Sequence, residues 1–162
     1  MRTLGFIVLP AAMLAAPAFA AEALPPSGAA KLAAYQVCRP LAALDMGASG
    51  SEASTECNGV VRNLDPQKQP DNLSIHCLES TSNRPEAYRY WGTCVQTDSD
   101  GDKLFVTYDG VKTGQFKWIG GTGKYKDVTG SGALSVVVAP NGAPGLFAYT
   151  LNFDANWTTK AK

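Results

Sequence analysis

The stretch from Gly114 to Gly132, GQFKWIGGTGKYKDVTGSG, constrains the fold of this chain more than any other. It is dense in glycine, and sequence rich in β-branched and aromatic residues lies on either side. Glycine tolerates positive φ and lets two backbones approach closely, which a tight connection between strands requires. The stretch therefore predicts a corner of a β-sheet protein. Its structural turn residues are Gly120, Gly121, Gly123, Gly130 and Gly132.

The same stretch does not fit a phosphate-binding loop. A P-loop requires Ser or Thr after its Gly-Lys pair, whereas Tyr125 follows Lys124. A dinucleotide-binding fingerprint needs a third glycine and a following helix, and neither is found here. We therefore expect no nucleotide cofactor, and nothing else in the sequence predicts a cofactor of another kind.

Eight segments have the composition of β-strands. They cover residues 33–38, 55–64, 72–81, 87–97, 103–109, 112–119, 132–139 and 146–157. Turn signals separate them, and the last one alternates cleanly between apolar and polar residues. This pattern predicts an all-β sandwich or barrel. The segment at 103–109 is apolar on both faces, which indicates an outer wall covered by a loop or a neighbouring subunit.

Four cysteines, Cys38, Cys57, Cys77 and Cys94, predict two disulfides. Facing residues in an antiparallel hairpin have a constant sum of residue numbers. Pairing Cys38 with Cys57 and Cys77 with Cys94 centres each hairpin in a segment that its composition assigns to a loop. We therefore predict these two cross-strand pairs among the three connectivities. A zinc site is the weaker alternative, because no C-x-x-C spacing occurs and the only histidine, His76, is adjacent to a cysteine.

The N-terminus has the pattern of a secretory signal peptide. Arg2 precedes an apolar run, and small residues predict cleavage after Ala20. A membrane anchor is the alternative, but the run is short and prolines interrupt it. We divide the chain into a signal peptide at 1–20, a flexible leader at 21–32 and a β-barrel domain at 33–162. The protein is expected in the periplasm or the medium, with no membrane span after cleavage.

The charged residues argue against a nucleic-acid partner and raise the question of a calcium site. The formal net charge is zero, which does not favour nucleic-acid binding. The segment Asp98 to Asp102 spaces carboxylates as a calcium loop does, but Lys103 stands where the tight turn should be. We interpret the segment as a hairpin turn and predict no metal site.

Residues 120–125, GGTGKY, together with Gly130 and Gly132, resemble the G-G-T-G-K-[FY]-x(4)-G element of the dirigent and allene oxide cyclase barrel superfamily. Small exported bacterial members carry D-x-D-G-D-K before that element, as residues 98–103 do here. The resemblance covers roughly residues 77–157. It implies a single antiparallel, eight-stranded, calycin-like barrel with an interior pocket, often assembled as a trimer. The N-terminal third and the cysteines do not match the plant enzymes, so no catalytic residues are transferred.

Three functions are compatible with these features. We favour an exported, non-enzymatic barrel that binds a small hydrophobic ligand and forms a homo-oligomer, a dimer or a trimer. An isomerase or cyclase of the dirigent or allene oxide cyclase type is the alternative, and a structural envelope-associated protein with a filled barrel is a further one. An inward-facing carboxylate in an apolar pocket would favour the isomerase. The candidate pocket residues are Tyr90, Phe105, Phe116 and Trp118.

Overall fold

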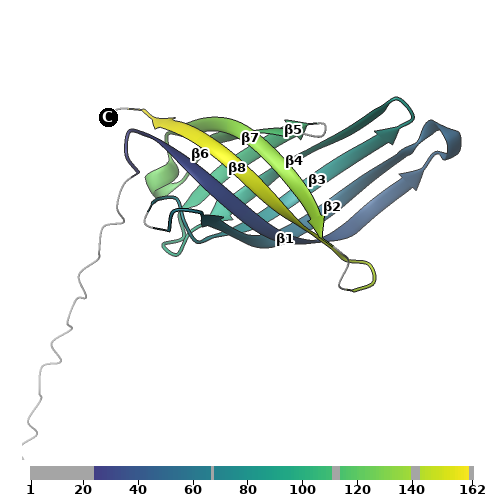
Figure 1. Cartoon of the computed structure of the whole chain (residues 1–162), viewed down its shortest axis with the longest axis horizontal. Coiled ribbons are helices and arrows are strands. Elements are labelled where there is room, and N and C mark those ends of the chain that lie inside the picture. The colour runs from purple at the N-terminus through teal and green to yellow at the C-terminus, as the bar shows by residue number, and fades with distance from the viewer. Residues whose placement is uncertain (1–23, 67, 111–113, 140–142, 161–162) are drawn as a thin grey trace, which may run out of the picture.

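The computed structural model describes residues 24–66, 68–110, 114–139 and 143–160. The signal peptide predicted over 1–20 lies outside these residues. Eight antiparallel strands close into one barrel in chain order, with β8 returning to pair with β1 (Figure 1). The strands are β1 (Ser27–Asp45), β2 (Ser51–Asn63), β3 (Leu73–Arg84), β4 (Ala87–Thr97), β5 (Lys103–Gly110), β6 (Gly114–Gly121), β7 (Val128–Ala139) and β8 (Phe147–Thr159). The predicted fold class is confirmed.

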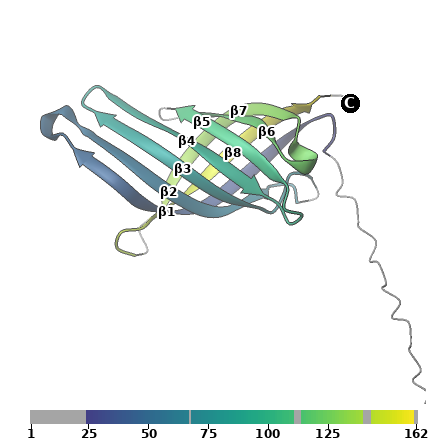
Figure 2. The same ribbon diagram turned by 180° about the vertical axis from the view of Figure 1, so that it is seen from behind.

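Two short 3-10 helices, η1 (Gly47–Ser49) and η2 (Gly123–Tyr125), interrupt the strands. Across the part of the chain that the structure describes, no helix has the length and apolar character needed to cross a bilayer. Helix η2 lies within the glycine stretch, between β6 and β7. It closes one end of the barrel, opposite the end at which the longer hairpins project (Figure 2).

The flexible leader predicted over 21–32 is too long, because β1 begins at Ser27. From Ser27 onward β1 pairs with β8, and Ser27 itself faces Thr158. The small residues here serve packing: a Cβ at Gly28 would lie 2.2 Å from the Trp157 ring. The composition of a linker and that of a closely packed edge are alike, and only the pairing with β8 distinguishes them.

The predicted disulfides are confirmed. Cys38 is bonded to Cys57 and Cys77 to Cys94, with Cα–Cα distances of 4.1 Å in both. The β3–β4 hairpin turns at residues 85–86, where the sum of the cysteine numbers placed it. Cys57 also stands directly opposite Cys77, so all four cysteines form one row across β1 to β4. Their side chains are buried inside the barrel, and two disulfides indicate an oxidising, extracytoplasmic environment.

The interior near η2 is an apolar core built from alternate residues of each strand. Phe116 is fully buried and meets Phe153 edge to face, with ring centroids 5.1 Å apart. Trp118 packs against Trp157 in the next layer. Such ring pairs add to the stabilisation from buried area by about 1 kcal/mol each. This end of the barrel is filled by side chains, as small barrels commonly are.

At the other end, strands β1 to β4 run on past their neighbours (Figure 1). β1 pairs with β8 only as far as Cys38, which faces Phe147, the first residue of β8. We call the part beyond, residues 39–54 and 80–89, the overhang. The free edge of β1 there carries Pro40 and a bulge in the register with β2. Both features discourage pairing with another strand, so the overhang forms a protected rim of the barrel.

Candidate functional site

The barrel interior becomes polar at the level of the cysteine row. Glu79 lies on the inward face of β3, two residues beyond Cys77. Three further polar side chains point inward at this level from β1, β5 and β8: Gln36, Tyr108 and Tyr149. Each continues an apolar inward-facing series on its own strand, so the same alternation that builds the core places these groups inside. Buried polar groups are uncommon without a partner, and this cluster is the candidate site.

Glu79 is the centre of the cluster. Its carboxyl group is hydrogen-bonded to the Tyr149 hydroxyl. Burial raises the pKa of Glu79 above its usual value near 4.5, and the nearby Tyr108 hydroxyl and the hydrogen bond from Tyr149 only partly offset this. Burial and the negative charge of Glu79 raise the pKa values of both tyrosines. The site therefore shifts the carboxyl group toward its neutral form beside neutral phenols, and a carboxyl group placed in this way can donate or accept a proton.

Two glycines make room for the tyrosines. Gly92 stands in register between Glu79 and Tyr108, and a Cβ there would lie 2.4 Å from the Tyr108 hydroxyl. Gly114 does the same for Tyr90, whose hydroxyl would lie 2.6 Å from an added Cβ. The rings of Tyr90 and Tyr108 have centroids 5.8 Å apart. The two glycines thus let both phenols reach across the neighbouring strand into the barrel.

Several buried polar atoms in this cluster have no hydrogen-bond partner among the described residues. They are Gln36 Oε1 and the hydroxyls of Tyr90 and Tyr108. Gln36 is only 3% exposed. The Tyr108 hydroxyl faces Glu79 closely enough to influence its pKa, yet its geometry is not that of a good hydrogen bond. Such groups usually bind a protein group, water or a ligand, so the cluster can satisfy polar atoms of a small molecule.

The predicted pocket residues do not converge on one site. Phe116 and Trp118 lie together in the apolar core, with ring centroids 5.8 Å apart. Tyr90 belongs to the polar cluster, and Phe105 lies on the opposite face of β5 from the inward-facing Leu104 and Val106. A ligand-binding role for the four stays a prediction, and the structure separates them into three places.

Sequence reasoning missed Glu79, although a signal was present. Leu73, Ile75 and Cys77 share one parity in β3, and Glu79 continues it. An acidic residue on the cysteine-bearing face of a strand must point into the barrel if the cysteines do. That inference requires a confirmed inward orientation of the cysteines, which the composition does not give.

The carboxyl oxygen of Glu79 and the sulfurs of Cys38 and Cys57 lie within 4.8 Å of one another. This is the spacing of a metal-binding group. The two sulfurs are joined in a disulfide, however, and metal ligation by cysteine requires thiolates. The oxidised protein therefore does not present this group as a metal site.

The Asp98–Asp102 turn and the glycine stretch form a single unit at the opposite end of the barrel. The Lys124 ammonium lies 2.8 Å from Asp98 and 2.8 Å from Asp100. Asp102 accepts the backbone N–H of Lys124. An ammonium group thus stands between the carboxylates that a calcium ion would need, which supports the prediction of a structural hairpin turn.

Three of the predicted turn glycines are explained by this unit. Gly120 and Gly123 have φ of 117° and 50°, which favour glycine. A Cβ at Gly123 would lie 1.8 Å from a carboxylate oxygen of Asp102, and one at Gly121 would lie 2.0 Å from a backbone oxygen. Gly130 and Gly132 lie within β7, where their missing side chains let the β8 backbone and nearby aromatic rings approach.

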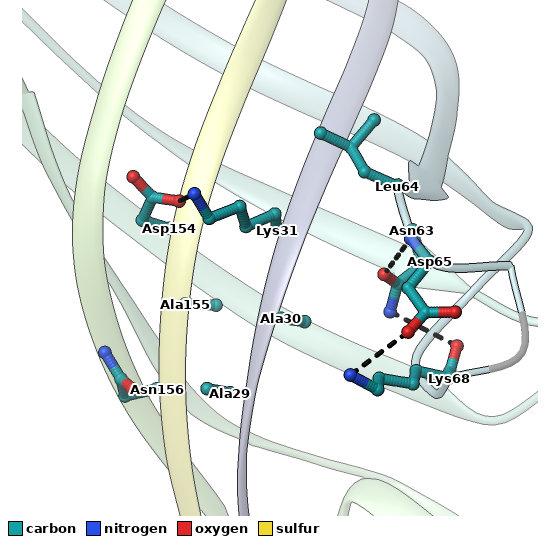
Figure 3. Close-up of a pocket in the computed structure, with 10 residues that line it drawn as sticks. All are labelled: Ala29, Ala30, Lys31, Asn63, Leu64, Asp65, Lys68, Asp154, Ala155 and Asn156. Atoms are coloured by element: carbon teal, nitrogen blue, oxygen red, sulfur yellow. Dashed lines mark hydrogen bonds and ion pairs between the residues drawn. The ribbon is translucent and has the colours of Figure 1, made fainter.

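A hollow of about 560 Å³ lies outside the polar cluster, where β1 and β8 pass the loop after β2 (Figure 3). Lys31 is 4.0 Å from Asp154 and Lys68 is 3.0 Å from Asp65, and all four side chains are largely exposed. Exposed ion pairs of this kind contribute little energy and are readily hydrated. The hollow offers a wet, mixed surface, so the interior cluster remains the better candidate.

The comparisons with known proteins agree with the barrel. The fold is similar to that of two solved pterocarpan synthase dirigent proteins. The first is 11% identical, with a TM-score of 0.51 over 85% of this chain and 89% of the other. The second is 12% identical, with a TM-score of 0.53 over 83% and 97%. No protein-family model matches the sequence, and no curated protein is significantly similar to it. The chain therefore has a dirigent-like fold, and the comparisons extend no further than the fold.

Proposed function

We propose that the protein is exported and binds a small, mostly apolar molecule at the mouth of its barrel, with a polar group of that molecule directed at Glu79. The observation that carries this proposal is the partly buried carboxyl group of Glu79, which has a raised pKa and lies near polar atoms without partners. The overhang continues the barrel wall beyond this level and would cover one side of the ligand. The dirigent-like fold supports a barrel used in this way.

A second function, isomerisation or cyclisation of the bound molecule, is favoured by Glu79 itself. A neutral carboxyl group can protonate an electron-rich carbon or oxygen and then take a proton back from the product. Such a reaction needs no cofactor or co-reactant, because the atoms are only rearranged. A general acid matched to its task contributes about 10²–10⁴-fold to rate. We place this function second because binding alone requires only the contacts described.

The outer wall supports the expected self-association. One row of facing residues crosses β2, β1, β8 and β7: Val60, Tyr35, Thr150 and Val137. The side chains of Val60, Tyr35 and Val137 are exposed. Exposed apolar side chains grouped in this way are typical of protein interfaces. We propose a homo-oligomer that buries this row. Native mass spectrometry of the wild type and of Tyr35→Glu would show whether the subunit count falls when a charge is added.

Binding can be tested by NMR. A panel of small aromatic and alicyclic alcohols, each titrated into ¹⁵N-labelled protein, should perturb the amides of β3, β4 and β5 around Glu79. The Glu79→Gln variant should weaken binding, while Glu86→Gln, an exposed change in the β3–β4 turn, should not. Shifts confined to the outer hollow of Figure 3, or equal affinity in both variants, would contradict the proposal. Product analysis of the bound compounds would then separate binding from isomerisation.

A further inference from the structure

The two disulfides occupy different positions in the barrel. Cys38 is the last residue of β1 that pairs with β8, and beyond it β1 has a free edge in the overhang. Cys57 is its partner on β2. All four cysteines are paired on both sides and at most 3% exposed. The β1–β8 pairing ends at Cys38, however, so the Cys38–Cys57 bond lies beside the overhang, whereas Cys77 and Cys94 have Cys57 and Val106 as their outer neighbours.

Among the described residues, only the Cys38–Cys57 disulfide has a hydroxyl group beside it. The Tyr149 hydroxyl lies 3.1 Å from Cys57 Sγ. A disulfide sulfur carries no hydrogen, so this contact is a hydrogen bond only when the Tyr149 hydroxyl is the donor. The other disulfide has an amide instead: Gln36 Nε2 lies 3.4 Å from Cys77 Sγ. An amide can donate a hydrogen bond, but it does not transfer its proton at ordinary pH.

Tyr149 is in turn hydrogen-bonded to a carboxyl group, that of Glu79. The Tyr149 hydroxyl donates this hydrogen bond to the Glu79 carboxyl group, which lies within 4.8 Å of both sulfurs of the bond. Burial raises the pKa of Glu79. When Glu79 is protonated, it can donate to the Tyr149 oxygen instead, and the Tyr149 hydrogen is then free to point at Cys57 Sγ. The other titratable groups that face Glu79 are the phenols of Tyr88, Tyr90 and Tyr108. They are neutral at ordinary pH and add no competing charge.

We propose that Cys38–Cys57 is a redox-active disulfide that exchanges with small dithiols, and that Cys77–Cys94 is a structural staple. In the exchange, a thiolate of the dithiol attacks Cys38 Sγ. The S–S bond breaks, and its electron pair goes to Cys57 Sγ, which takes the proton of Tyr149 while Tyr149 takes one from Glu79. Protonation of the departing sulfur assists the step, since leaving-group stability controls thiol–disulfide exchange.

The second thiol of the dithiol then completes the reaction. It attacks the dithiol's own sulfur in the mixed disulfide and forms a cyclic disulfide, and Cys38 leaves as a thiolate that is protonated from water. The dithiol loses two electrons and two protons, the protein gains both, and Glu79 regains its proton from water. The exchange uses Glu79 and Tyr149, as the proposed ligand site does, but it needs no bound apolar ligand and so does not depend on the proposed function.

Partial reduction tests the proposal, with the second disulfide as an internal control. The folded protein is treated with dithiothreitol, quenched with an alkylating reagent at several times and mapped by mass spectrometry. We expect Cys38–Cys57 to be reduced at least about tenfold faster than Cys77–Cys94, the size of effect expected from proton transfer to a leaving group. Equal rates, or faster reduction of Cys77–Cys94, would overturn the proposal, and the wild-type protein is sufficient for this test.

Two variants identify the relay. Tyr149→Phe and Glu79→Gln should slow reduction of Cys38–Cys57 about tenfold and leave Cys77–Cys94 unchanged. In the wild type, the rate corrected for dithiolate concentration should fall as pH rises and Glu79 ionises, and this fall should be missing in Glu79→Gln. A uniform change at both disulfides would mean a loosened barrel, not a relay, and would refute the assignment. The NMR titration of the proposed ligand site is read separately, so each proposal can fail alone.

Discussion

Replacing Lys124 with methionine should destabilise the barrel through one buried ion pair. The ammonium group joins the β4–β5 turn to the glycine stretch by its contacts with Asp98 and Asp100, each 2.8 Å long. The side chain of Lys124 is 11% exposed and that of Asp98 only 5%. Burial opposes the charge of Lys124, but the hydrogen bonds and charges of Asp100 and Asp98 outweigh it and raise the pKa of the lysine.

The expected loss of unfolding free energy follows from the Asp98 carboxylate, which the substitution leaves without its counter-charge. Asp98 would keep the N–H groups of Asp100 and Asp102 but lose its counter-charge. Breaking a fully buried pair costs about 3–5 kcal/mol, and an exposed pair is worth about 1 kcal/mol or less. Asp100 is half exposed, so we expect an intermediate loss of about 2 kcal/mol. For a domain of this size that lowers Tm by about 6 °C.

Urea denaturation at several pH values measures this loss. Lys126→Met is the matched control, because Lys126 is exposed two residues further along. Burial opposes ionisation of Asp98, yet Lys124 and two backbone N–H groups lower its pKa below the usual 3.8. A lowered pKa gives stability that is present above that value and lost as pH falls through the folded pKa. The gap between wild type and Lys124→Met should therefore shrink in acid; a gap below about 0.5 kcal/mol at pH 7, within the range of ordinary surface substitutions, would refute the reasoning.

Three further outcomes are expected. Glu79 has a raised pKa, so its contribution to stability is present below about pH 4.5 and is lost as pH rises through the folded pKa; urea titration should show this loss in the wild type and not in Glu79→Gln. Gly123→Ala should cost about 2–3 kcal/mol by thermal denaturation, because of its positive φ and the contact with Asp102, whereas Gly145→Ala, at positive φ in open space, should cost about 1 kcal/mol. Calcium should leave the Tm of the wild type unchanged, because Lys124 occupies the carboxylates; a rise would show that the metal displaces it.

The hairpins were predictable because their information is local. Turn composition and cysteine numbers placed the β3–β4 turn independently, and Arg84 does face Ala87 across it. The β1–β2 hairpin was predicted half a residue out, since the bulge between Pro40 and Ala42 changes the register there. A bulge adds one residue without a strong sequence signal. Constant-sum arithmetic therefore gives the pairing of the cysteines but not the full path of the strand.

The length of β1 was not predictable for the opposite reason. Its first residues pair with β8, more than a hundred positions away, and their alanines and glycine carry no strand signal of their own. The overhang is equally non-local, because it exists only where β1 and β4 outrun β8 and β5. Glu79 and Tyr149 meet across the barrel for the same reason: closure brings β3 and β8 to face each other, and no short-range pattern records that.

The glycine stretch and the chemistry lie at opposite ends of the strands. Lys124 and Asp98 close the end of the barrel at the β4–β5 turn, while Glu79 faces the rim at the β3–β4 end. The residues that carry the resemblance to the dirigent barrels therefore define how the sheet closes, and among the described residues no hydrogen bond or ion pair joins them to Glu79, Tyr108 or Tyr149. The polar groups near the rim can therefore change without breaking the ion pairs that hold the closed end. A motif confined to the closed end can thus identify the fold while leaving the ligand, the reaction and the redox behaviour to residues such as Glu79 and Cys57.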